Sequence, residues 1–169
     1  MVCCCGLPAG YLNWVPAGQF PVTAVLPQTV GDLSLRDDSA SRWAAARLKQ
    51  QLRDAKASGK PFAGVYADGN GKRVTIFGTT GLRVTPQADV EAELRRLADQ
   101  FSLRDVQPFD LGETGAHERC GIGTVDGGSV VVCGWADHGS LGTVVANRRS
   151  VSDSAQLTGI LRSAVLTHG

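Results

Sequence analysis

The segment Arg119–Trp135 reads RCGIGTVDGGSVVVCGW and predicts the centre of the fold. Asp-Gly between two apolar stretches is a strong signal for a β-hairpin with a two-residue loop. If Asp126 and Gly127 form that loop, Cys120 falls directly opposite Cys133. Counting from the turn places the two cysteines at a non-hydrogen-bonded pair, where side chains approach most closely. The sequence therefore predicts a disulfide between Cys120 and Cys133, and closing so short a loop stabilises a fold by about 3 kcal/mol.

The sequence also allows a second register of the same hairpin. If Gly127 and Gly128 form the loop instead, Cys120 lies opposite Trp135. A bridge from Cys120 to Cys133 then becomes diagonal and harder to form. In that register the two cysteines are candidates for free thiols.

The composition favours one domain and excludes some classes of protein. A chain of 169 residues is long enough to bury a substantial core in a single domain. Its 17 basic and 16 acidic residues nearly balance, which argues against a general nucleic-acid binder. Aromatic residues make up only 6% of the chain, so stacking platforms for single strands are not expected either.

Apolar periodicity predicts three helices interspersed with strands. An Asp-Asp-Ser sequence precedes a helix that runs to about Ser58, Thr85-Pro86 starts a second helix, and Ser150 with Asp153 has capping-box spacing for a third. Short turns between consecutive strands indicate antiparallel pairing. We therefore predict an α+β fold, in which a mainly antiparallel sheet of about six to seven strands is covered on one face by three helices.

The first 31 residues contain no charged side chain. Prolines interrupt this apolar lead too often for a membrane span, and it lacks the basic region and continuous apolar core of a signal peptide. We therefore divide the chain into a Pro/Gly-interrupted lead, 1–31, and a single globular α+β domain, 32–169. The lead is interpreted as a membrane-edge remnant, with an interaction arm as the alternative.

Three successive cysteines, Cys3, Cys4 and Cys5, open this lead. Structural zinc sites use cysteines two to four residues apart, so that both sulfurs reach one ion. Three adjacent cysteines do not offer that geometry readily, even with help from His117 or His168. We expect no metal site and no cofactor.

Aspartate, histidine and serine lie within four residues at Asp137, His138 and Ser140. A catalytic triad is a spatial arrangement that is usually drawn from distant segments, and neighbouring residues on a strand point to opposite faces. The cluster is therefore interpreted as a strand end and turn, and we expect no catalytic residue. The alternative is a hydrolase-like or thiol-dependent enzyme, in which His138 acts with Ser140 or Cys133.

The segments around the two cysteines, Arg119–Gly121 and Val132–Gly139, resemble a group of actinobacterial proteins of unassigned function. The similarity extends to Pro27–Leu33, to Gly64–Tyr66 and to the final helix, so it covers most of the chain. Those proteins look membrane-anchored or secreted, with an N-terminal apolar segment followed by a small α+β domain. The resemblance implies this architecture and an extracytoplasmic location, and it supplies no catalytic residues. This chain departs from the pattern because it lacks a complete N-terminal span.

These features favour a non-enzymatic extracytoplasmic domain, in the cell envelope or secreted, with a binding or structural role. The expected partner is a protein or a cell-envelope component, not a nucleic acid, and membrane association through the N-terminus is a further expectation. Besides the enzyme, a second alternative is a structural subunit of an envelope assembly. The enzyme hypotheses require different structural features. A thiol enzyme requires an accessible free cysteine, whereas a serine enzyme requires Ser140 and His138 to converge in a pocket.

Overall fold

The computed structural model describes residues 15–16 and 18–169 of the chain. Within these residues, three helices and ten strands form an α+β fold. The helices are α1 (Ser39–Asp54), α2 (Pro86–Phe101) and α3 (Val151–Val165). The strands are β1 (Val22–Ala24), β2 (Thr29–Val30), β3 (Leu33–Leu35), β4 (Lys60–Ala67), β5 (Arg73–Thr80), β6 (Arg104–Phe109), β7 (His117–Val125), β8 (Gly128–Ala136), β9 (Ser140–Asn147) and β10 (Leu166–His168).

Eight strands form one antiparallel sheet in the order β2-β3-β4-β5-β9-β8-β7-β6, and β1 pairs with β10 in a small second sheet. The predicted α+β fold with a large antiparallel sheet is confirmed, and the strands are more numerous than the six to seven expected. The additional strands include β2, β3 and β10, which have only two or three residues each. Strands this short cannot display a readable alternation of apolar and polar residues. Two strands, β1 and β2, lie within the lead 1–31.

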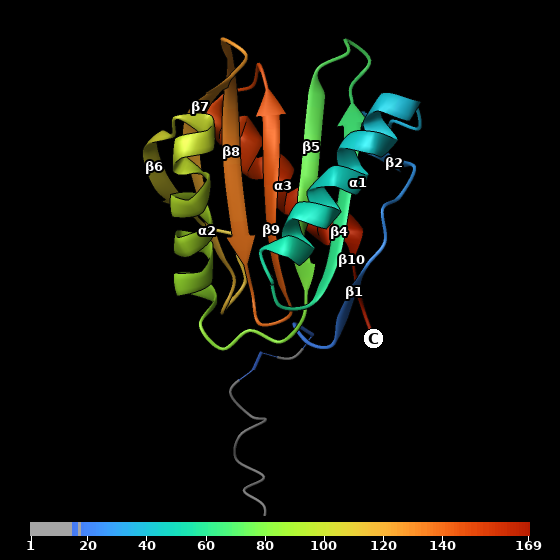
Figure 1. Cartoon of the computed structure of the whole chain (residues 1–169). Helices are drawn as coiled ribbons and strands as arrows, with labels where there is room; N and C mark the ends of the chain where they lie inside the picture. The colour runs from blue at the N-terminus through green and yellow to red at the C-terminus, as the bar shows by residue number, and fades with distance from the viewer. Residues whose placement is uncertain (1–14, 17) are drawn as a thin grey trace, which may run out of the picture.

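The helices cover both faces of the large sheet (Figure 1). On one face, α1 packs over β4 and β5 while α2 packs over β7 and β8, and α3 covers the opposite face. The prediction that all three helices share one face is therefore wrong. The helices cover both faces because of β8. Val130–Ala136 is buried at seven consecutive positions, so both faces of this strand are apolar. A sheet that is apolar on both faces needs a cover on each of them.

The central hairpin, β7 and β8, has the register predicted from an Asp-Gly loop. Cys120 is paired with Cys133, and Asp126 and Gly127 are the unpaired loop residues. Their φ angles are 50° and 78°, the positive values that a type I′ hairpin turn requires at both positions. The alternative register with a Gly-Gly loop is wrong.

The helix starts follow the predicted capping chemistry. Asp38 is the N-cap of α1 and its carboxylate accepts a hydrogen bond from the Ser41 amide at 3.0 Å. Pro86 occupies the first turn of α2, and the Ser150 hydroxyl accepts from the Asp153 amide at the start of α3. Among the described residues, none of the helices is long and apolar enough to span a bilayer.

Two glycines make room for two aromatic rings on the face that α3 covers. Phe62, Gly78, Gly142 and Trp135 are consecutive partners across β4, β5, β9 and β8. The ring centroids of Phe62 and Trp135 are 6.3 Å apart. A Cβ atom on Gly142 would lie only 2.1 Å from the Trp135 ring, so a glycine is required there. The missing side chains of Gly78 and Gly142 would lie on this same face, so both glycines serve the packing of the two rings.

Candidate functional site

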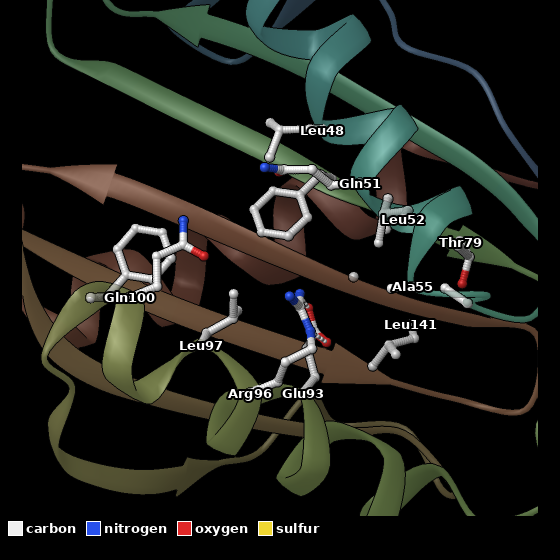
Figure 2. A pocket seen from close by; sticks show the side chains of 15 residues that line it. Leu48, Gln51, Leu52, Ala55, Thr79, Glu93, Arg96, Leu97, Gln100 and Leu141 are labelled. Carbon is white, nitrogen blue, oxygen red and sulfur yellow. Dashed lines mark hydrogen bonds and ion pairs between the residues drawn. The ribbon is translucent and has the colours of Figure 1, made fainter.

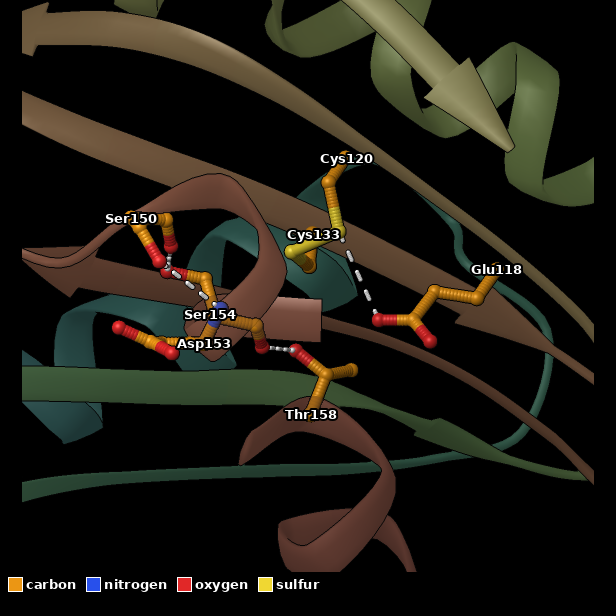
Figure 3. The surroundings of a disulfide bond; sticks show 7 residues. All are labelled: Glu118, Cys120, Cys133, Ser150, Asp153, Ser154 and Thr158. Atoms are coloured by element: carbon orange, nitrogen blue, oxygen red, sulfur yellow. Dashed lines mark hydrogen bonds between the residues drawn. A yellow bond between two sulfur atoms is a disulfide. The ribbon is translucent and has the colours of Figure 1, made fainter. Parts of the chain in front are cut away.

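Cys120 and Cys133 form a disulfide in the middle of the sheet, with their Cα atoms 4.0 Å apart. Both cysteines are fully buried, and Ala155 of α3 packs against them. Figure 3 shows the bond beneath the first turns of α3. Because the sulfurs are bonded to each other and shielded from solvent, neither presents the accessible thiol that the thiol-dependent alternative requires.

The basic residues that neighbour Cys120 in sequence point away from the disulfide. His117 and Arg119 differ from Cys120 by an odd number of positions on β7, so they point to the opposite face of the sheet. Arg119 Nη2 donates to Glu91 Oε1 of α2 at 3.0 Å. The disulfide therefore has no activating cation from its own strand.

The polar group that contacts the disulfide is a buried carboxyl. Glu118 is 3% exposed, and its Oε1 lies 3.5 Å from Cys120 Sγ (Figure 3). Burial raises the pKa of Glu118 to about 8, although the Thr158 hydroxyl and the Arg162 charge act in the opposite direction. Glu118 is thus protonated at neutral pH, and it is the donor in any hydrogen bond to the disulfide sulfur, which carries no hydrogen.

Glu118, Cys120 and Cys133 also form the one cluster of potential metal ligands in the described part of the chain, with donor atoms within 4.8 Å of one another. Cysteine binds metals as a thiolate, and both sulfurs are already used in the disulfide. The oxidised cluster is therefore a structural cross-link with a neutral acid beside it. The predicted roles of Cys3–Cys5 concern positions outside the described residues.

Asp137, His138 and Ser140 meet at the turn between β8 and β9 without forming a triad. Ser140 Oγ donates to Asp137 Oδ2 at 2.8 Å and accepts from Trp135 Nε1 at 3.0 Å. His138 Nδ1 instead lies 2.9 Å from the backbone oxygen of Arg83. Since Ser140 is fully buried and is bonded to the aspartate, the His–Ser pair of the hydrolase alternative is not assembled. The geometry agrees with the interpretation of a strand end and turn.

Arg162 of α3 extends this cluster into a buried ion network. Its Nε and Nη2 lie 2.9 and 2.8 Å from Asp137 Oδ2, and its Nη1 lies 2.7 Å from Glu113 Oε2. Hydrogen bonding to Arg162 lowers the pKa of Glu113. Gln19 completes the network, because its Nε2 donates to Glu113 Oε1 at 2.9 Å. The network connects four segments that are far apart in the sequence.

An apolar pocket lies on the other face of the sheet, between α1 and α2 (Figure 2). Its volume is about 160 Å³, close to that of cavities that accept a benzene-sized group. The helices contribute aliphatic and aromatic side chains to the walls, and the floor consists of Phe77 with the bare backbone of the two paired glycines. The main lining residues are Leu48, Leu52, Leu97, Phe101, Phe77, Gly78 and Gly142.

The charges at this pocket neutralise each other. Glu93 and Arg96 stand one turn apart on α2, with Arg96 Nη2 2.7 Å from Glu93 Oε1. The remaining polar side chains include Gln51 on α1 and Gln100 on α2, which face each other across the opening in Figure 2. Mainly apolar walls with a few polar groups are typical of sites for small apolar ligands.

This pocket was not predictable from the sequence. Each helix shows a clear apolar stripe, but the space depends on how far apart α1 and α2 are placed on the sheet. No local pattern records that distance. The side chains of residues 78 and 142 would point to the α3 face, so the two glycines do not mark the pocket.

Comparison with known proteins adds no relative, because no protein-family model, no curated protein and no solved structure matches this chain.

Proposed function

We propose that this protein is a non-enzymatic, extracytoplasmic binding domain whose ligand enters the pocket between α1 and α2. The observation that carries the proposal is the pocket itself, which combines about 160 Å³ of space with mainly apolar walls and a neutral Glu93–Arg96 pair. Ligand sites are typically concave and mostly apolar, with a small number of polar groups for orientation. An apolar group of a protein or of an envelope component fits such a pocket.

The absence of a catalytic role is proposed because the reactive side chains serve the framework. Ser140 and Asp137 are bonded to each other and to Trp135 and Arg162. The disulfide is covered by α3. These interactions support a rigid scaffold that positions the two helices.

An extracytoplasmic location is supported by the disulfide, since such bonds form and persist mainly in oxidising compartments. The buried position of Cys120 and Cys133 in the centre of the sheet makes the bond part of the core. We propose that the apolar lead attaches the domain to the membrane edge or to a partner.

The test is titration of the whole protein with hexan-1-ol, a neutral probe, followed by methyl NMR of Leu52 and Leu97. We expect saturable shifts of both residues, because both line the pocket. Ala55→Trp at the pocket wall should abolish the shifts, whereas Ala46→Trp on the exposed side of α1 should leave them unchanged. Unsaturable shifts, or equal effects of the two variants, would overturn the proposal.

A further inference from the structure

We infer that the ligand of this pocket is a medium-chain amphipathic carboxylate, with its alkyl chain between α1 and α2 and its head group at Arg73 and Arg148. The inference rests on the proposed binding function and names the chemical class of the ligand. It is argued from a second hollow, from the charges around that hollow, and from the pairing of the strands beneath.

A second hollow continues the pocket along β5 and β9. It shares Leu48, Phe77 and Phe101 with the first, so the two lie end to end over the strip between α1 and α2. Its far end is formed by Arg73 at the start of β5 and by Arg148 just after β9. The combined groove is therefore apolar at one end and basic at the other.

The two arginines carry the charge that a carboxylate needs. Both are exposed, and neither forms an ion pair with any residue that the structure describes. Asp126 is the one acid that lines this hollow, so the basic groups outnumber it. Guanidinium groups bind carboxylates through charge-assisted hydrogen bonds that are often bidentate. An anionic head group complements this end of the groove.

The spacing along β5 sets the length of the alkyl chain. Phe77 of the pocket and Arg73 are four positions apart in one strand, which corresponds to about 13 Å at about 3.3 Å per residue. An extended alkyl chain with carbon–carbon bonds of about 1.5 Å advances about 1.25 Å per carbon, so roughly ten carbons cover this distance. Decanoate is a ligand of this size.

The strand pairing favours an alkyl chain over a peptide. β5 lies between β4 and β9, and β9 lies between β5 and β8, so neither strand has a free edge. A peptide in the groove could not pair with them, and its amides would lie unpaired over an apolar floor, which is costly. An alkyl chain has no polar groups to satisfy.

The test compares decanoate, decan-1-ol and decyltrimethylammonium by calorimetric titration of the whole protein at low salt. We expect decanoate to bind roughly three- to tenfold more tightly than decan-1-ol, with a preference that falls as salt is added. The double variant Arg73→Gln, Arg148→Gln should remove the preference and leave the affinity for decan-1-ol unchanged. The matched control Arg95→Gln, Arg104→Gln loses the same charge at exposed positions away from the groove and should keep the preference.

The outcomes separate this inference from the proposed function. If decan-1-ol binds but decanoate binds no better, or if the cationic probe binds as well, the carboxylate assignment is overturned while the pocket stands. If none of the three probes binds, both proposals fail. Tighter binding of the acidic peptide Ac-Leu-Ser-Ser-Ser-Glu-NH₂ than of decanoate would show a peptide ligand and overturn the assignment.

Discussion

Replacing Glu118 with glutamine should remove part of the pH dependence of this protein's stability. Glu118 is buried beside the disulfide, and burial holds its pKa at about 8 in the folded protein, against an ordinary value of 4.5. Between these two values the folded protein binds more protons than the unfolded chain. The free energy of unfolding is therefore highest in acid and falls as the pH rises, until the folded-state pKa has been passed.

The magnitude follows from the two pKa values. Within this range, each pH unit lowers the free energy of unfolding by about 1.4 kcal/mol per group. From about pH 5 to about pH 8, Glu118 alone should therefore cost the wild-type protein roughly 3–4 kcal/mol of stability. Glutamine has nearly the same shape and cannot ionise, so the variant should lose this contribution.

The assay is urea denaturation of the wild type and of Glu118→Gln at several pH values between about 5 and 8. The difference in unfolding free energy between the two proteins should shift by roughly 3–4 kcal/mol in favour of the variant across this range. Other titrating groups are common to both proteins and cancel in that difference. Asp99→Asn, which removes a charge from an exposed position on α2, is the matched control and should show a constant difference. A constant difference for Glu118→Gln as well would refute the reasoning.

Three further predictions concern the framework. Gly142→Ala places a Cβ atom 2.1 Å from the Trp135 ring and should destabilise the fold by roughly 1–3 kcal/mol or more. The control is Gly159→Ala in α3, where the nearest atom is at 3.6 Å, and it should be neutral or stabilising by up to about 1 kcal/mol. Equal urea midpoints for the two variants would contradict this prediction. Replacing both bridged cysteines with alanine should lower the free energy of unfolding by about 3 kcal/mol, and an unchanged denaturation midpoint would count against a stabilising cross-link. Asp137→Asn weakens the buried partner of Arg162 and should cost roughly 2–4 kcal/mol in the same assay, far more than Asp99→Asn does.

The hairpin register and the helix starts were predictable because short-range chemistry encodes them. Two positive φ angles at Asp126 and Gly127 are needed for the turn, and that sequence supplies residues that tolerate them. Once the loop is placed, alternation along the strands fixes Cys120 opposite Cys133. Caps such as Asp38 act over three residues, so they too are visible in the sequence.

The buried network and the pocket were not predictable, because they depend on contacts between residues that are far apart in the sequence. Arg162 is separated from its partners Asp137 and Glu113 by 25 and 49 positions. Nothing near any of these residues indicates which charge will meet which. The apolar run of β8 indicates that both faces of the sheet are covered, but it does not indicate which helix lies on which face.

The central hairpin, its disulfide register and the α+β class follow from the amino-acid sequence, because turns, caps and alternation are properties of neighbouring residues. The hydrogen bonds that Asp137 accepts from Ser140 and Arg162, and a spacing of α1 and α2 wide enough to leave a pocket, are visible only in the tertiary structure. Both depend on distances between segments far apart in the chain. Such distances are set by the packing of the whole core, which no local pattern records.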